Sequence, residues 1–140
     1  MKVESCPDGR ERRRGALAHL AAALGLVLPL GSVAGPLLVG WLFRESDFVR
    51  RHASHAWRFQ ASVLLYEAAL TGVVVGVVSL PAGAAEEALG QAAVLAGLLL
   101  LLALLGGVLL ADVILVLRAA RAAYNGVACS YPFTLRFFKA

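Results

Sequence analysis

Long apolar runs dominate the chain and limit the ways in which it can fold. Three of them reach or approach the roughly 20 residues that a membrane-spanning helix needs, and they cover residues 15–43, 59–80 and 92–117. Charged residues make up only 16% of the chain, against about a quarter in a typical soluble domain. A soluble domain of 140 residues cannot bury this much apolar surface. The sequence therefore predicts an all-α integral membrane protein with a single membrane domain over residues 16–140.

The amino-terminal segment, residues 1–15, is charged and does not resemble a secretory signal sequence. Its charges extend too far, and no small-residue cleavage site follows the first apolar run. We expect the first apolar run to remain in the mature protein. Cys6 and Cys129 lack the spacing of a metal site and are too few for a disulfide framework.

The distribution of Lys and Arg predicts how the chain is oriented. Five lie in residues 1–14, four in 44–58, none in 81–91 and four in 118–140. Short basic segments stay on the cytoplasmic side of a membrane. We therefore expect both termini and the 44–58 segment in the cytoplasm, at the inner membrane of the cell, and the 81–91 loop on the other side.

Three simple spans cannot produce this orientation, so the first apolar run needs a reversal. Pro29, Gly31, Ser32, Gly35 and Pro36 interrupt it, and proline and glycine break helices. We interpret residues 16–43 as a hairpin of two short helices, about 16–28 and 33–43, that enters and leaves on the cytoplasmic side. One kinked span is the alternative.

The pattern of residues 46–58 predicts a basic amphipathic helix, which begins at Ser46 or Asp47 and leads into the span 59–80. At 100° per residue the aromatic and small residues, with His52 and Gln60, fall on one side, and the arginines fall on the other. This pattern is typical of a helix in the membrane interface. The residues expected at anionic lipid head groups are Arg50, Arg51, Trp57, Arg58, Arg118 and Arg121.

Small residues recur at four-residue spacing in the two long spans, 59–80 and 92–117. They are Gly72 and Gly76 in the first span, and Ala103, Gly107 and Ala111 in the second. Such stripes allow helices in lipid to approach closely. The stripes predict either packing of the two spans against each other or pairing of two copies of the chain.

Two acidic residues, Glu67 and Asp112, interrupt the long apolar runs. Ionisable residues inside a span are costly and indicate a functional site by default. Together with His19 of the hairpin they predict a proton- or cation-linked site. The alternative is that both acids contact polar neighbours and only hold the helices together.

The remaining templates for chemistry fail. His52 and His55 are three residues apart on a helix, but no Cys or further His completes a tetrahedral metal shell. The "GSVAG" stretch is not a nucleophile elbow, and no phosphate-binding loop is present. Because the basic helix continues into a span, lipid phosphates are its nearest anionic partners, rather than nucleic acid. We expect no enzyme activity, no metal and no cofactor.

Four stretches in the same order resemble a known family. They are "ALAHL", "LPLGSVAGPLLVGWLFR", "FVRRHASHAWRFQASVLLY" and "AAYNGVACSYPFTLRFFK". They are similar to a family of small bacterial and archaeal membrane proteins known as a domain of unknown function, distantly similar to the Tic-type channel subunit of the chloroplast inner-envelope translocon. The residues that match its blocks are Gly35, Pro36, Phe48, Val49, His52, Ala56, Phe59, Gln60, Ser62, Tyr66, Tyr131, Pro132, Arg136 and Phe137. His55, Trp57 and Arg58 depart from the family pattern.

The resemblance implies a helical bundle that contacts other membrane proteins, with a carboxyl-terminal tail at 124–140. We therefore expect a non-enzymatic multi-pass membrane protein, a small subunit or an assembly or translocation helper of a larger complex. The alternative function is a small proton- or cation-linked transporter or channel element that uses Glu67 and Asp112.

Overall fold

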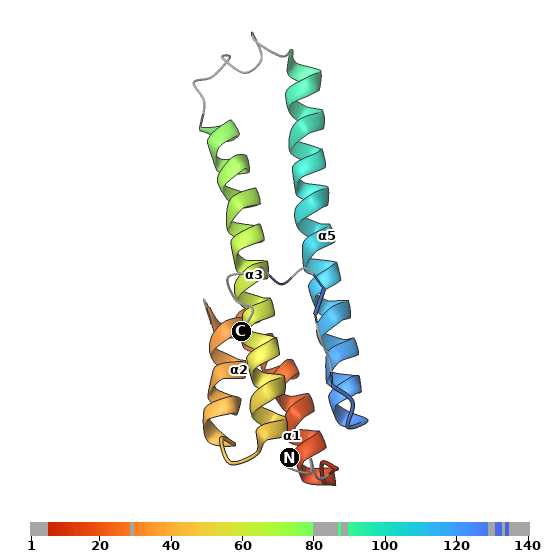
Figure 1. The fold of residues 1–140 in the computed structure, drawn as a ribbon. Helices are drawn as coiled ribbons and strands as arrows, with labels where there is room; N and C mark the ends of the chain where they lie inside the picture. Colours follow the sequence, from red (N-terminus) through yellow and green to blue (C-terminus); the bar gives the residue numbers. More distant parts are fainter. Residues whose placement is uncertain are drawn as a thin grey trace. The chain divides into compact units, whose positions relative to one another are not determined.

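The structure, a computed structural model, describes residues 6–28, 30–79, 87, 90–128, 131, 132 and 134. Every regular element in these residues is a helix, which confirms the all-α prediction. The elements are α1 (Gly9–Leu20), the 3₁₀ helix η1 (Ala21–Leu26), α2 (Gly31–Leu42), α3 (Asp47–Val78) and α5 (Gln91–Tyr124) (Figure 1).

The chain divides into two compact units. The hairpin unit comprises residues 1–62 and 113–140, and the paired-helix unit comprises residues 63–112. The hairpin unit thus contains α1, η1, α2, the first half of α3 and the end of α5. The paired-helix unit contains the rest of the two long helices.

The chain reverses between the end of η1 at Leu26 and the start of α2 at Gly31, which overlaps the reversal predicted between helices at about 16–28 and 33–43. Both α1 and η1 pack against α2, as the two arms of a hairpin do. Leu30 adopts a left-handed backbone conformation with φ of 62° just before α2 begins. Gly35 and Pro36 lie inside α2 and do not form the turn. Gly35 is required there for another reason, because a Cβ atom would overlap the backbone carbonyl of Ala21.

The start of α1 explains why the hairpin begins earlier than the predicted residue 16. Asp8 caps the helix by accepting a hydrogen bond from the Glu11 amide, and the Glu11 side chain accepts one from the Asp8 amide. This capping box satisfies two amides that have no partner inside the helix. The charged amino-terminal residues therefore form the first turns of α1.

Small side chains bring the helices of the hairpin unit close together. A Cβ atom on Gly40 of α2 would lie 2.9 Å from Cβ of Ala53 in α3, and Gly15 of α1 leaves room for the Phe48 ring. Two clusters of buried residues form this core: Ala18, Val39, Val49 and Ala53 in one, and Ala16, Ala120 and Ala123 in the other.

The predicted basic helix and the span after it form one continuous helix, α3. Ser46 caps its start by accepting a hydrogen bond from the Val49 amide at 3.3 Å. The predicted apolar side of this segment is buried, and it includes Val49, His52 and Phe59. Arg50 and Arg51 on the other side are exposed. The apolar side of this segment packs into the protein's own core, and the arginine side remains available to lipid head groups.

Within the paired-helix unit, α3 and α5 each have one row of less exposed residues, called the seam. A row of less exposed residues on each helix follows steps of three and four: Val63, Glu67, Leu70, Val74 and Val77 in α3, and Val94, Leu98, Leu101, Leu105, Val108 and Asp112 in α5. Leu64, Tyr66 and Gly97 are also partly buried. This spacing is that of helices that pack side by side along a heptad seam. Both helices are long and apolar enough to cross a membrane. Most of their other side chains are exposed, as expected for a surface covered by lipid.

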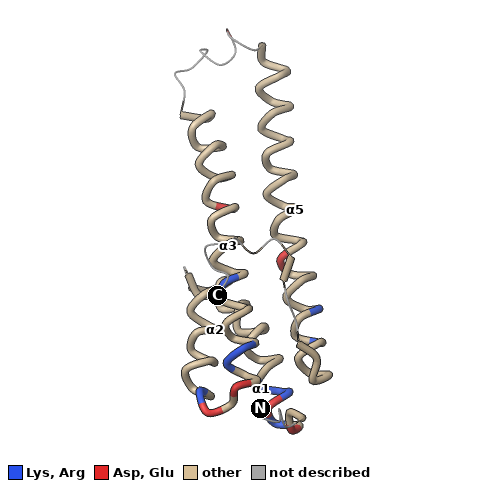
Figure 2. Tube along the Cα trace, in the orientation of Figure 1, with Lys and Arg blue, Asp and Glu red and all other residues tan. Residues whose placement is uncertain are grey.

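Charged residues of the hairpin unit lie at the first turns of α1 and at the connection from α2 to α3, and further basic residues lie on α3 and at the end of α5 (Figure 2). The 81–91 loop, which the topology prediction requires on the opposite side, lies outside the described residues except for Glu87, Gly90 and Gln91. The predicted orientation of the chain therefore stays a prediction.

Candidate functional site: a buried His–His–Tyr chain

Two histidines from different helices meet in the core of the hairpin unit. Nε2 of His19, at the end of α1, lies 2.9 Å from Nδ1 of His52 in the second turn of α3. His19 is fully buried and His52 is 3% exposed. The two rings meet edge to face at an interplanar angle of 89°. The contact joins the first helix of the hairpin to the first half of α3.

Tyr131 extends this pair into a chain of three side chains. Its hydroxyl lies 2.8 Å from Nδ1 of His19, on the opposite side of the ring from His52. The Tyr131 ring stacks on Phe59 of α3, with 4.1 Å between the ring centroids and an interplanar angle of 6°. The carboxyl-terminal segment is thereby connected to α1 and α3 at one buried point.

The hydrogen-bond chain has two possible directions when both imidazoles are neutral. A neutral imidazole has one N–H donor and one lone-pair acceptor. If Tyr131 donates to Nδ1 of His19, then Nε2 of His19 donates to Nδ1 of His52. In the reverse direction His52 donates to His19, and His19 donates to the Tyr131 oxygen. Both arrangements satisfy every nitrogen that the structure places in the chain.

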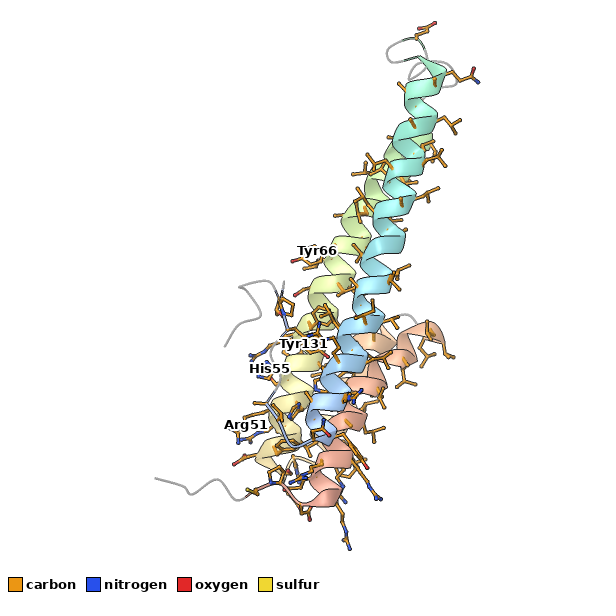
Figure 3. All side chains as sticks on the ribbon, turned by 90° about the vertical axis from the view of Figure 1, so that its right-hand side faces the viewer. Arg51, His55, Tyr66 and Tyr131 are labelled. Atoms are coloured by element: carbon orange, nitrogen blue, oxygen red, sulfur yellow. The ribbon has the colours of Figure 1, made fainter. Side chains whose placement is uncertain are left out.

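The surroundings favour the neutral form of this site. Burial, and then repulsion from His52 and His55, lowers the pKa of His19 from 6.5 to about 3. His55 and Arg51 both extend from α3 near Tyr131 (Figure 3). Desolvation penalises a charged imidazole, and neighbouring positive groups add to the penalty. At neutral pH His19 is therefore uncharged.

His19, His52 and Tyr131 do not provide the ligands of a complete metal centre. In the part of the protein that the structure describes, no group of three or more His, Cys, Asp or Glu side chains could hold an ion. Two imidazole nitrogens would fill only half of a tetrahedral shell. The 2.9 Å separation fits an N–H···N hydrogen bond between them.

His19 and His52 were both predicted as candidate polar residues, but not as a pair. His19 was grouped with Glu67 and Asp112, whereas its hydrogen-bond partners are His52 and Tyr131. Glu67 and Asp112 lie in the paired-helix unit, where both occupy seam positions and are close enough to interact electrostatically. The available signal was His52 on the apolar side of its predicted helix and His19 within the first apolar run, since each buried ring needs a polar partner.

Gln60, the other polar residue on the apolar side of α3, is 2% exposed. Gln60 also interacts with another group and is not without a partner. Among the described residues, every buried polar side-chain atom has a hydrogen-bond partner. The polar groups in this core are thus paired, as buried polar groups in folded proteins generally are.

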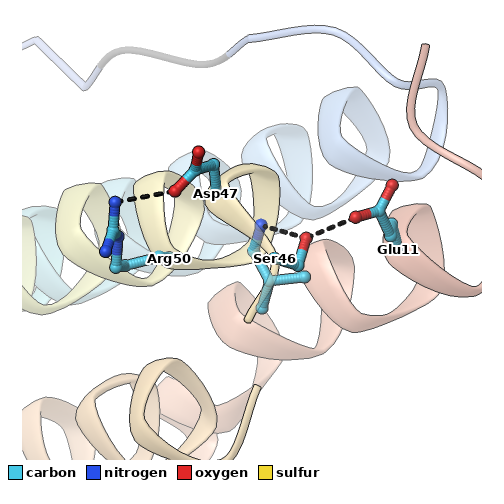
Figure 4. A network of polar contacts seen from close by, with 5 residues as sticks. Glu11, Ser46, Asp47 and Arg50 are labelled. Carbon is cyan, nitrogen blue, oxygen red and sulfur yellow. Dashed lines mark hydrogen bonds and ion pairs between the residues drawn. The ribbon is translucent and has the colours of Figure 1, made fainter. Parts of the chain in front are cut away.

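The residues predicted to contact lipid head groups lie mostly at the surface. Arg51, Arg118 and Arg121 are exposed. The guanidinium carbon of Arg58 lies over the Trp57 ring, 5.6 Å from the ring centroid. Arg50 is exposed and forms an ion pair with Asp47 at 2.7 Å (Figure 4). An exposed pair of this kind contributes little to stability.

The small-residue stripes do not lie on the seam of the paired-helix unit. A Cβ atom on Gly72, Gly76 or Gly107 would meet nothing within 4 Å, and Ala103 and Ala111 are exposed. The structure therefore does not show packing of these stripes against each other. Pairing with another chain stays a prediction.

A comparison with protein families finds a match over most of the chain. Residues 10–138 match the family described as the magnetosome magnetite crystal formation protein family. This agrees with the predicted membership in a family of small membrane proteins, but it does not support a similarity to the Tic-type translocon subunit. No curated protein and no solved structure matches the chain.

Proposed function

The chain belongs to the magnetosome magnetite crystal formation protein family, and we propose that it serves crystal formation as a non-enzymatic component of the surrounding membrane. In this proposal it is a small subunit or an assembly or translocation helper of a larger membrane complex. It is a multi-pass protein of the inner membrane or of a compartment derived from it, with both termini in the cytoplasm.

The observation that carries the proposal is the contrast between a satisfied polar interior and an open apolar exterior. The polar groups of the hairpin core bond one another, as His19, His52 and Tyr131 do. On α3, by contrast, Gly72 and Gly76 face open space near the apolar end of the helix. In lipid, small residues of this kind let a second helix approach closely. Such a surface suits association with other proteins in the membrane.

The arginines of the hairpin unit support attachment to a membrane with anionic lipids. Arg51, Arg118 and Arg121 are exposed beside the ends of the span helices. Each basic residue near an anionic membrane surface contributes about 1 kcal/mol of attraction. This attraction would fix the depth of the protein in the bilayer and keep its basic end on the cytoplasmic side.

Purification of the tagged protein in mild detergent, followed by mass spectrometry, tests the proposed complex. We expect other membrane proteins to co-purify in a fixed ratio. A protein that is always recovered alone and monomeric would contradict the proposal. Labelling of single cysteines at positions 50 and 86 tests the orientation, because position 50 should react only from the cytoplasmic side.

A transporter or channel element is the second candidate. Glu67 and Asp112 favour it because two acidic residues occupy the seam between the span helices and interact electrostatically. Replacing them together, with Glu67→Gln and Asp112→Asn, separates the two functions. A transport function predicts loss of proton or cation flux in liposomes. A complex subunit predicts unchanged partners and no flux in either protein.

A further inference from the structure

The proposed function leaves the apolar outer surface of the hairpin unexplained. This hairpin surface comprises the turn residues Leu26, Val27, Leu28 and Leu30, the residues Leu17, Leu20 and Leu24 on the first arm, and Leu37, Leu38, Trp41 and Leu42 on the second. Their side chains are between 42% and 90% exposed. A continuous apolar surface of this kind marks contact with a membrane or with another protein.

We propose that the hairpin surface inserts into the acyl chains of a single membrane leaflet, so that the protein favours membranes in which that leaflet is convex. The occupant of the surface is lipid, and the property that it recognises is curvature. This inference is independent of whether the protein is a subunit of a larger complex.

The first argument is that the charged residues of the hairpin all lie at its open end. Residues 15–43 contain no Asp, Glu, Lys or Arg, whereas every residue of 10–14 is charged, and Arg44, Glu45 and Asp47 follow the second arm. The two arms are joined at this end, because the guanidinium carbon of Arg14 lies 4.3 Å from the centroid of the Phe43 ring. Since a charge in hydrocarbon is costly, the open end stays at the head groups and the turn points into the membrane.

The second argument is that the turn satisfies its own backbone. The amides of Val27 and Leu28 both donate to the Leu24 carbonyl, at 3.1 and 2.9 Å, and the Gly31 amide donates to the Leu28 carbonyl at 2.9 Å. No water is present among acyl chains to replace such bonds, so internal pairing is a condition for entering them. The described part of the turn meets this condition at these three amides.

The third argument is the length of the arms. From Arg14 to Leu26, and from Leu30 to Arg44, each arm spans about 20 Å by helical rise. The hydrocarbon core of a bilayer is about 30 Å thick, so one leaflet contributes about 15 Å. Whatever its tilt, a hairpin of this length enters one leaflet and does not cross the core.

The basic side of α3 favours lipid over a protein as the occupant. Arg51 and His55 extend from one side of α3, and α1 lies on the other side (Figure 3). The hairpin unit thus combines an apolar side with a basic side, the distribution by which helices lie in the interface of an anionic membrane. A protein partner would have to cover the turn and both arms at once.

Insertion into one leaflet has a mechanical consequence. The two long helices add area to both leaflets where they cross the membrane, whereas the hairpin adds area to one leaflet alone. The membrane relieves this difference by bending until the enlarged leaflet is convex. Binding through apolar surface at this depth therefore depends on curvature.

A spin label at position 27 tests the insertion itself. The full-length protein would carry Val27→Cys, with Cys6 and Cys129 replaced by serine, in nanodiscs of phosphatidylcholine and phosphatidylglycerol. We expect relaxation of the label by oxygen, which dissolves among acyl chains, and not by a water-soluble nickel chelate. Relaxation by the chelate would overturn the proposal. A label shielded from both reagents would also overturn it, because protein, such as a second copy, would then cover the turn.

Membrane tubes drawn from giant vesicles test the preference for curvature. The protein with Cys129→Ser would be labelled from outside at Cys6, which is exposed, with a dye that does not cross membranes. Only molecules with the open end of the hairpin outside are then visible, and their outer leaflet is convex in the tube. We expect a severalfold higher density, relative to lipid, in the tube than on the vesicle. Equal densities would overturn the proposal.

Two double variants assign the preference to the hairpin surface. Leu26→Ser with Val27→Ser changes side chains that are 90% and 78% exposed, so the fold should persist, as circular dichroism would verify. We expect the enrichment in the tube to fall toward one. The matched control, Leu100→Ser with Val75→Ser, changes exposed residues of the long helices and should retain the enrichment. Enrichment that is equal in the two double variants would exclude the hairpin surface as its cause.

Discussion

The Ser46 hydroxyl donates a 2.6 Å hydrogen bond to the Glu11 carboxylate and so joins the first turn of α1 to the first turn of α3 (Figure 4). The Ser46 hydroxyl also accepts a hydrogen bond from the Val49 amide, and the Glu11 carboxylate also accepts one from the Asp8 amide. One hydrogen bond thus connects the caps of two helices that are far apart in the sequence. The basic end of the hairpin unit is held together at this point.

Ser46→Ala should destabilise the hairpin unit by about 1–2 kcal/mol, because it removes a helix cap and the bond to Glu11 together. Unfolding in mixed detergent micelles, followed by tryptophan fluorescence, measures this change, since Trp41 and Trp57 both lie in the hairpin unit. Ser54→Ala is the matched control on the same helix and should change stability by less than about 0.5 kcal/mol. Equal effects of the two substitutions would show that the connection between the caps is unimportant.

Gly35→Ala should prevent the hairpin from closing. A Cβ atom at this position would overlap the backbone carbonyl of Ala21, which cannot move without shifting η1. We expect a loss of about 3 kcal/mol or more, or failure to fold. Gly72→Ala makes the same change where a Cβ atom meets open space, and it should leave the fluorescence transition unchanged. A stable Gly35→Ala protein with a native transition would argue against the close approach of η1 and α2.

Sequence reasoning recovers the features of this fold that depend on local pattern. The apolar runs predicted helices, and the angular sorting of residues 46–63 predicted which side of α3 is buried, including Val49 and Phe59. The predicted position of the reversal, between about residues 28 and 33, overlaps the observed connection from Leu26 to Gly31. The roles of the individual glycines were harder to predict, because glycine both breaks helices and permits close packing. Gly35 serves packing, and the left-handed residue is Leu30, which carries no turn signal in the sequence.

The candidate site was less predictable, because its members come from three distant segments. His52 was recognised as a polar residue on an apolar face that lacked a partner. Nothing in the local pattern assigns that partner to His19, 33 residues away, or connects His19 to Tyr131, 112 residues away. Long-range pairing of buried polar groups depends on how helices pack, which periodicity alone does not encode.

Tyr131→Phe should cost the hairpin unit about 1–3 kcal/mol, because it leaves Nδ1 of the buried His19 without its partner while the stack on Phe59 remains. Tyr124→Phe is the matched control, since Tyr124 is 56% exposed. Unfolding free energies of the two variants at neutral pH, measured by the same fluorescence assay, test this. Equal stabilities would mean that the hydroxyl of Tyr131 contributes nothing to the core.

The stability of the hairpin unit should depend on pH in a definite direction. The folded-state pKa of His19 is lowered to about 3, from 6.5 in the unfolded chain, so the unfolded chain binds more protons in acid. The stability that depends on neutral His19 is therefore fully present above pH 6.5 and is lost as the pH falls from 6.5 toward 3. The loss reaches at most about 1.4 kcal/mol per pH unit for one histidine. Unfolding free energies at pH 7.5, 6.0 and 5.0 measure it, and a flat or rising profile toward acid would contradict a neutral buried His19.

Leucine at both Gly72 and Gly76 should weaken association with other chains in the membrane. Both positions face open space, so the larger side chains fit in the isolated protein and leave the hairpin unit intact. They would, however, block the close backbone approach that small residues permit between helices in lipid. Co-purification in mild detergent measures the effect, and we expect at least a severalfold loss of partner or of a second copy. Val78→Leu is the control, because Val78 is exposed on a different side of the same helix. If the double variant retains every partner in the wild-type ratio, this face of α3 is not where the protein binds them.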